Sequence, residues 1–156
     1  MSKSLKRVIR ALDAAGIDAT PVEMTGGART AQDAADAVGC ELDQIAKSII
    51  FRGETTNEAV LFITAGGNQV CADAASKVAG EPLGKADAAL IRSQTGFAIG
   101  GVSPVGHLSP IRAFFDPKLL EFDTVWAAAG TPRHVFPINP VDLQKISNAQ
   151  AVDFTL

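Results

Sequence analysis

Two short apolar runs with a polar stretch between them constrain the fold of this chain most strongly. Residues 48–51 (SIIF) and 59–64 (AVLFIT) are rich in β-branched and aromatic residues, whereas the stretch between them reads RGETTNE. Runs of this kind joined by a short polar segment predict a β-hairpin. The first strongly β-type part of the chain is therefore expected to be an antiparallel pair of strands.

Helices and strands alternate irregularly around this hairpin. Apolar spacing predicts helices over 4–15, 31–38, 72–79, 86–94 and 140–146, with a further helical turn over 42–46. Further strands are predicted over 19–24, 97–99, 111–115, 124–128 and 134–138. Hairpins beside crossovers predict one compact α/β domain over residues 1–156, with a mixed sheet rather than a doubly wound parallel one.

The composition is that of an ordinary globular protein, with 47% hydrophobic and 20% charged residues. The net charge of −3 does not suggest a chain that coats nucleic acid, so no DNA partner is expected, although a small basic patch could hold a partner with a nucleic-acid part. No apolar stretch reaches the ~18 residues of a membrane span, and the amphipathic start is unlike a signal peptide. We expect a cytoplasmic protein with no membrane contact.

Most sequence motifs of enzymes are missing. There is no GxGxxG after a strand, no P-loop, no GxSxG elbow and no HExxH. Cys40 and Cys71 lack metal spacing and read as buried small apolar residues, and two histidines are too few for a histidine-rich centre, so no metal or cofactor is expected. Ser103 has no recognisable base and stands beside a proline, as turn residues often do.

The stretch TGFAIGGVSPVGH, residues 95–107, has more backbone freedom than a plain turn needs. Gly100 and Gly101 carry no Cβ, so the main chain can approach a ligand and direct its N–H groups outward, while Pro104 fixes the exit of the loop. A stiff loop with free amides can form an oxyanion hole. A tight turn at a sheet corner would account for the same residues, and the loop alone does not separate the two interpretations.

Lys47 is the second unusual residue. It stands in DQIAKSIIF, residues 43–51, between a helical turn and the apolar run, where its ammonium would be partly buried. A lysine at such a place either extends to solvent along its apolar stem or serves as a fixed point charge near a carbonyl or phosphate oxygen.

Taken together, IAKSIIF, AVLFITAGGNQV and ADAALIRSQTGFAIGGVSPVGH resemble the YbaK family of aminoacyl-tRNA editing domains, over nearly the whole chain. The most specific marks are the lysine at the head of the strand, Lys47, and the Gly-x-x-x-Pro loop over Gly100–Pro104. The resemblance implies a mixed, mostly antiparallel, barrel-like sheet flanked by helices. It also implies a relation to the editing domain inserted in bacterial prolyl-tRNA synthetases.

The resemblance implies an activity that needs no side-chain nucleophile, metal or cofactor. Such proteins hydrolyse the ester that joins a wrong amino acid to the 3′ end of a tRNA. The relation to the editing domain of prolyl-tRNA synthetases implies a proline tRNA as the substrate and that synthetase as a possible partner. Amides of Gly100 and Gly101 would stabilise the oxyanion during attack by water, and Lys47 would anchor the substrate. A non-catalytic module of the same fold, binding tRNA or a synthetase, is the alternative.

Further residues are expected to contribute to the substrate pocket. These are Ser48, Val102, Ser103, Pro104, Gly130, Thr131 and His134. Relatives that remove cysteine from proline tRNA carry an SGG loop where this chain has AAGTPRH, residues 128–134, so cysteine specificity is not implied. His134 would fit a packed strand equally well. The basic side of the first helix (Lys3, Lys6, Arg7, Arg10) is either a simple solvated face or a source of phosphate contacts.

Overall fold

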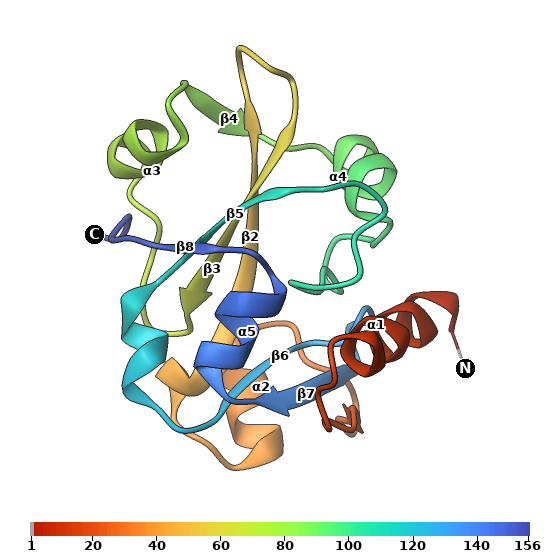
Figure 1. Cartoon of the computed structure of the whole chain (residues 1–156). Coiled ribbons are helices and arrows are strands. Elements are labelled where there is room, and N and C mark those ends of the chain that lie inside the picture. The colour runs from red at the N-terminus through yellow and green to blue at the C-terminus, as the bar shows by residue number, and fades with distance from the viewer. Residues whose placement is uncertain (1) are drawn as a thin grey trace.

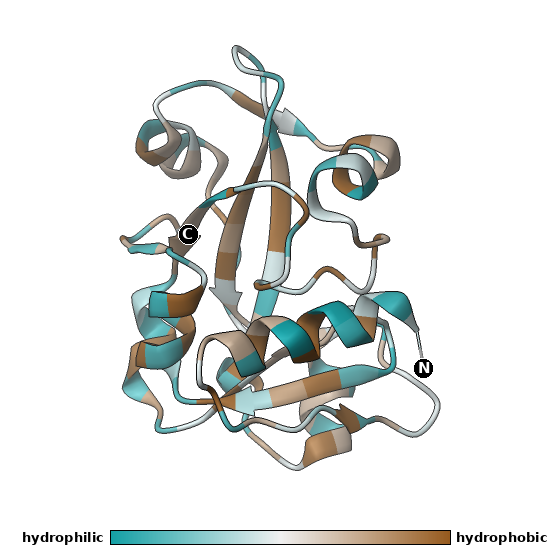
Figure 2. Ribbon diagram, turned by 45° about the vertical axis from the view of Figure 1, so that its right-hand side comes forward, coloured by the Kyte–Doolittle hydropathy of each residue, from teal (hydrophilic) through white to brown (hydrophobic). Residues whose placement is uncertain are grey.

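The predicted hairpin forms the centre of the structure. The computed structural model describes residues 2–156, and in it β2 (Ile45–Gly53) pairs antiparallel with β3 (Ala59–Ala65), with Ser48 opposite Ile63 (Figure 1). Every residue of β3 is buried because helices or loops cover both of its faces. Hydrophobic residues run along both strands and give way to hydrophilic ones at the tip (Figure 2).

Six shorter strands complete one mixed sheet. They are β1 (Val22–Glu23), β4 (Leu83–Lys85), β5 (Arg112–Phe115), β6 (Val125–Ala128), β7 (His134–Ile138) and β8 (Gln150–Ala151). The order is β1-β7-β6-β2-β3-β5-β8, with β4 also beside β2. β2 is antiparallel to β3 and β4, and β7 to β1 and β6, whereas β2–β6, β3–β5 and β5–β8 are parallel. Among the described strands, β1 and β8 remain the two ends of this order, so its hydrogen bonds stop short of a closed barrel.

Helices pack on both faces of the sheet. They are α1 (Lys3–Ala14), α2 (Ala31–Val38), α3 (Ala72–Ala79), α4 (Ala88–Thr95) and α5 (Pro140–Ile146), with 3-10 turns η1 (Leu42–Gln44) and η2 (Pro117–Glu121). The largest core cluster joins α1, α4 and α5 to one face, while α3 packs with Phe62 and Phe114 on the other. Thr30 caps α2 in a capping box with Asp33, and Gly39 ends it in the left-handed conformation.

Several predicted boundaries are wrong for identifiable reasons. Residues 97–99 form no strand: Phe97 is buried in the core, but the chain turns at once, and the Gly101 amide donates to the Ala98 carbonyl. The helical turn predicted over 42–46 is only η1, so β2 begins at Ile45 and Lys47 is its third residue. Of the strand predicted over 19–24, only Val22–Glu23 (β1) pairs with another strand. The short strands β4 and β8 were not predicted.

One edge of β2 is left open between its neighbours. On that edge β6 pairs only with Ile45 and Ala46, and β4 begins opposite Phe51, so residues 47–50 face no strand. The Gly53 amide bonds across to Glu58, and antiparallel bonding alternates along the strand. The N–H and C=O groups of Ser48 therefore point to the open edge, and a cavity lies there.

Candidate functional site

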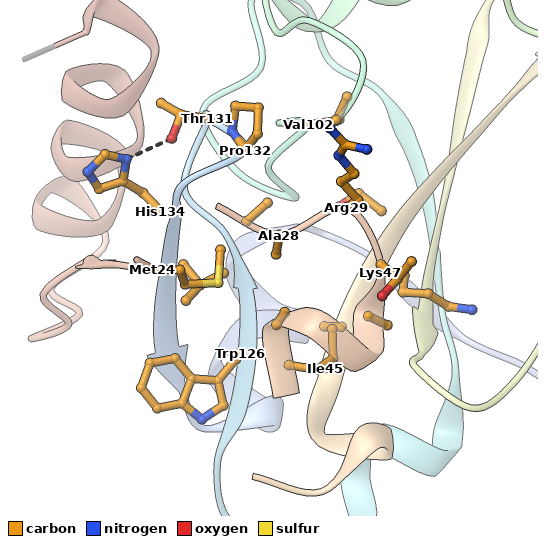
Figure 3. Close-up of a pocket in the computed structure, with 18 of the residues that line it drawn as sticks. Met24, Ala28, Arg29, Ile45, Lys47, Val102, Trp126, Thr131, Pro132 and His134 are labelled. Carbon is orange, nitrogen blue, oxygen red and sulfur yellow. Dashed lines mark hydrogen bonds between the residues drawn. The ribbon is translucent and has the colours of Figure 1, made fainter. Parts of the chain in front are cut away.

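A cavity of about 330 Å³ lies over the open edge of β2. Its floor and one wall are apolar, from Met24, the α2 alanines, Ile45, Trp126 and Val135, which form the second core cluster. Polar and main-chain groups complete the lining. They come from Arg29, Thr30, Lys47, Ser48, Gly100, Thr131 and His134 (Figure 3). Half of the cavity thus suits an apolar group, and the other half can form hydrogen bonds.

The cavity brings together only part of the residue set predicted from sequence. Lys47, Ser48, Gly100, Val102, Thr131 and His134 line it. Gly101, Ser103, Pro104 and Gly130 are buried and are not among its lining residues. The second group therefore belongs to the packing of the loops and not to the cavity wall.

Main-chain amides of the Gly-x-x-x-Pro loop are the most distinctive groups of the site. The amides of Gly100, Val102 and Ser103 donate to no group within residues 2–156, although Val102 and Ser103 are 8% and 0% exposed. Buried amides without an acceptor are rare in proteins. Gly100 and Val102, two of the residues with unbonded amides, line the cavity.

Gly101 differs from the sequence-based expectation. Its amide donates to the Ala98 carbonyl at 3.1 Å and is not free for a ligand in this structure. A Cβ at Gly101 would lie 2.9 Å from Thr131 Cα, so the glycine is needed because the Thr131 backbone passes against it. Its main contribution is to let two loops touch.

Ser103 and Gly130 also serve the packing of these loops. Ser103 is fully buried, and its Oγ accepts the Val105 amide at 3.2 Å, as expected for a turn residue. Gly130 has φ +94°, and a Cβ there would lie 2.8 Å from the Ser4 carbonyl oxygen. This glycine lets the β6–β7 loop pass beneath α1.

Lys47 is held by the loop that follows β3. Its Nζ donates to the Asn68 carbonyl at 2.7 Å, and in Figure 3 the side chain extends away from the labelled apolar residues. Burial lowers the pKa of Lys47, while the carboxylates of Asp116 and Asp43 act in the opposite direction. Lys47 thus places a fixed positive charge at the loop that follows β3, and its ammonium retains two further N–H donors.

His134 and Thr131 form a bonded pair on the cavity wall. Thr131 Oγ1 lies 2.7 Å from His134 Nδ1 and also accepts the Arg133 amide at 3.1 Å (Figure 3). When the threonine O–H donates to Nδ1, the ring proton resides on Nε2. Nearby, Ser48 Oγ is buried and has no hydrogen-bond partner among the described residues.

Sequence reasoning missed the α2 side of the cavity. Arg29, which precedes the α2 cap, lines the cavity, and its guanidinium makes no hydrogen bond or ion pair within residues 2–156. Met24 and Trp126 reach the same space from β-strand surroundings distant in sequence. No local motif marks these residues, because only the folding of α2 against β6 and β7 brings them together.

Other expectations about reactive groups can be compared with residues 2–156. Cys40 and Cys71 are free thiols and only half-buried, contrary to the expectation of full burial. Across this part of the chain, no group of three or more His, Cys, Asp or Glu side chains is placed to hold a metal ion. None of the helices described is both long and apolar enough to cross a membrane.

These features define a small α/β domain with a cavity lined partly by residues whose main-chain amides are unbonded. The family model for the aminoacyl-tRNA editing domain matches residues 25–146. The uncharacterized protein YwhH of Bacillus subtilis (strain 168) is 30% identical over 125 residues, which are 80% of this chain and 79% of that protein. The chain therefore belongs to the aminoacyl-tRNA editing domain family.

Solved structures agree with this assignment. A crystal structure of a protein provisionally described as a trans-editing enzyme for prolyl tRNA synthetase is 43% identical, with a TM-score of 0.93 over 100% of this chain and 99% of that one. A chain from work on epitope backbone grafting onto scaffold proteins is 41% identical, with the same TM-score and coverage. The mixed α/β fold and its family are thus established.

Proposed function

We propose that this protein is a trans-editing hydrolase that deacylates a mischarged aminoacyl-tRNA. The observation that carries the proposal is the pair of unbonded amides, from Gly100 and Val102, in two residues that line one cavity together with Lys47. The family assignment supports the substrate class. The 43% identical relative described for prolyl tRNA synthetase favours a proline tRNA that carries a wrong amino acid, with that synthetase as a possible partner.

The proposed reaction is attack of water on the ester carbonyl carbon. The carbonyl oxygen becomes an oxyanion, which accepts hydrogen bonds from the Gly100 and Val102 amides. The bond to the ribose oxygen then breaks, that oxygen takes the proton that the attacking water releases, and the free amino acid and the tRNA leave. One oxyanion donor is typically worth about 10²–10³ in rate. Lys47 anchors the substrate through its remaining N–H donors.

Selection of the amino acid is assigned to the apolar half of the cavity. The side chains of Met24, Ile45 and Trp126 line this half of the cavity, and the indole N–H is the one hydrogen-bond donor among them. A hydrophobic wall discriminates one methylene by only about 1–3 kcal/mol. We therefore assign a small amino-acid side chain as the substrate class and no single amino acid.

A panel of mischarged tRNAs tests the proposal. Wild type should release the amino acid from at least one of them, while Lys47→Ala and Gly100→Ala should release it more than tenfold more slowly. Gly80→Ala is the matched control, since Gly80 also has a positive φ (+75°) and open space around it but lies outside the cavity. Binding of tRNA without release from any member of the panel would replace the enzyme with a non-catalytic binding module.

A further inference from the structure

One side chain of α1 holds both ends of residues 96–106, the segment that contains the Gly-x-x-x-Pro loop. Arg7 donates from Nε to the Gly106 carbonyl at 2.7 Å and from Nη2 to the Gly96 carbonyl at 2.8 Å. Its guanidinium also lies 4.4 Å from the centre of the Phe97 ring. A Cβ at Gly96 would lie 2.5 Å from Arg7 Nη2, which explains the glycine at this position.

Arg7 is therefore not part of the solvated basic face that the sequence suggested. It is half-buried, whereas Lys3, Lys6 and Arg10 of the same helix are exposed. All of α1 lies outside residues 25–146, the range matched by the family model. The contact between this helix and the loop is thus a feature of the structure beyond the matched range.

His107 fixes the middle of the same segment. Its Nε2 lies 2.7 Å from the Ser103 carbonyl oxygen, and its ring packs edge-on against Phe97. Burial lowers the pKa of His107, so the ring is neutral near pH 7. Because the carbonyl can only accept, the single ring proton must reside on Nε2.

These contacts separate the donors of the loop from its acceptors. The carbonyls of Gly96, Ser103 and Gly106 accept bonds from Arg7 or His107, and His107 lines a different cavity from the one described above. The amides of Gly100 and Val102 stay unbonded, and both residues line the cavity over the open edge of β2. A peptide that turned over there would present an oxygen to the developing oxyanion and repel it.

We propose that Arg7 and His107 are positioning residues, which hold the carbonyls of Gly96, Ser103 and Gly106 in hydrogen bonds and thereby keep the amides of Gly100 and Val102 directed to the substrate. The chemical part of this inference rests on the proposed hydrolysis; the positioning itself does not. Neither side chain needs to touch the substrate.

Variants at both positions test this role through kcat and KM for a tRNA that wild type deacylates. Arg7→Met and His107→Ala should lower kcat about 10- to 10²-fold, since small misplacements of a site cost that much, with KM changed less than threefold. His107→Gln can place an N–H donor near the position of Nε2 and should recover at least threefold of the His107→Ala loss. Arg10→Met, on the exposed side of α1, is the matched control for kcat and should keep the kcat of wild type.

Amide hydrogen exchange gives a readout that does not depend on hydrolysis. Exchange within residues 96–106 should accelerate in Arg7→Met and His107→Ala but not in Arg10→Met, while cooperative unfolding is retained. If wild type deacylates nothing yet exchange behaves in this way, the proposed function fails and the positioning holds. The positioning role would be overturned if Arg7→Met and His107→Ala left kcat unchanged or raised only KM. It would also be overturned if His107→Gln were no more active than His107→Ala. If Arg7→Met does not fold, the comparison of the His107 pair decides.

Discussion

The Lys47 ammonium and the Asn68 carbonyl are hydrogen bonded at 2.7 Å, and the Asn68 side chain donates to Asp116 at 2.9 Å. Asp116 is 2% exposed and also accepts the amides of Ala65 and Lys118. The Lys47 ammonium is therefore placed, through Asn68, by a buried carboxylate on the far side of β3. Site geometry and core stability share these groups.

Replacement of Asp116 should show this connection. Asp116→Ala leaves two buried or half-buried amides and the Asn68 side chain without an acceptor, each worth about 1–3 kcal/mol, so we expect a loss of roughly 3 kcal/mol or more in unfolding free energy. Urea denaturation measures it. Asp123→Ala, at an exposed carboxylate, should change stability by less than about 0.5 kcal/mol. Equal effects of the two variants would contradict this account.

Glu81 should give the protein an acid-sensitive stability. Amide donation from Thr56, with further bonds from Arg112, lowers the pKa of Glu81 to about 2. A carboxyl with a lowered pKa stabilises the fold above its ordinary value of 4.5, and that contribution disappears as pH falls from about 4.5 toward 2.

We therefore expect Glu81→Gln to lower the denaturation midpoint at pH 7 and to flatten its decline over that acid range. Denaturant titrations between pH 2 and 7 measure both effects. Glu54→Gln, at the exposed tip of the β2–β3 hairpin, is the control and should keep the slope of wild type. A slope in Glu81→Gln as steep as that of wild type would refute the assignment.

Gly101→Ala should disturb two loops at once. The added Cβ would lie about 3.0 Å from three main-chain atoms of Thr131, which cannot rotate away as a side chain does. We expect a loss of about 1–3 kcal/mol in thermal unfolding, as for other overpacked sites. Deacylation should fall as well, because Thr131 carries the hydroxyl bonded to His134. A variant as stable and active as wild type would show that these loops separate freely.

Ile45→Val should alter selection without abolishing the reaction. Ile45 lies on the floor of the cavity, and removing one methylene costs about 0.5–1.5 kcal/mol of stability. The ratio of deacylation rates for tRNAs carrying 2-aminobutyrate and alanine should rise about tenfold or more, within the range for one methylene. Ile63→Val, on the neighbouring strand and outside the cavity, should leave the ratio unchanged. Equal ratios in both variants would remove Ile45 from the specificity wall.

Local patterns in the sequence predicted the hairpin, and the ends of β7 and α5, because strand alternation, the polar turn and Pro140 at the first helical turn act within a few residues. β4 and β8, of three and two residues, carry too little pattern to be recognised. The run at 97–99 looked like a strand because Phe97 is apolar, yet its burial comes from the turn that follows.

Part of the candidate site could likewise be predicted from local sequence patterns, and part could not. Lys47 and the Gly-x-x-x-Pro loop carry a recognisable motif, and the structure brings Lys47, Gly100 and Val102 to one cavity. Arg29 reaches it only through tertiary packing. Whether a glycine amide is free, as at Gly100, or already bonded, as at Gly101, depends on main-chain torsions that no residue type specifies.

The open edge of β2 has a consequence for solubility. An unpaired strand edge invites pairing with strands of other molecules, and natural proteins protect such edges. Here the exposed interval covers residues 47–50 between β6 and β4, a length of only about 13 Å at the usual rise per residue. A foreign strand of ordinary length would collide with the two flanking strands. The gap is thus long enough for a compact ligand such as the proposed aminoacyl end of a tRNA, but too short for edge-to-edge pairing with a strand of another molecule.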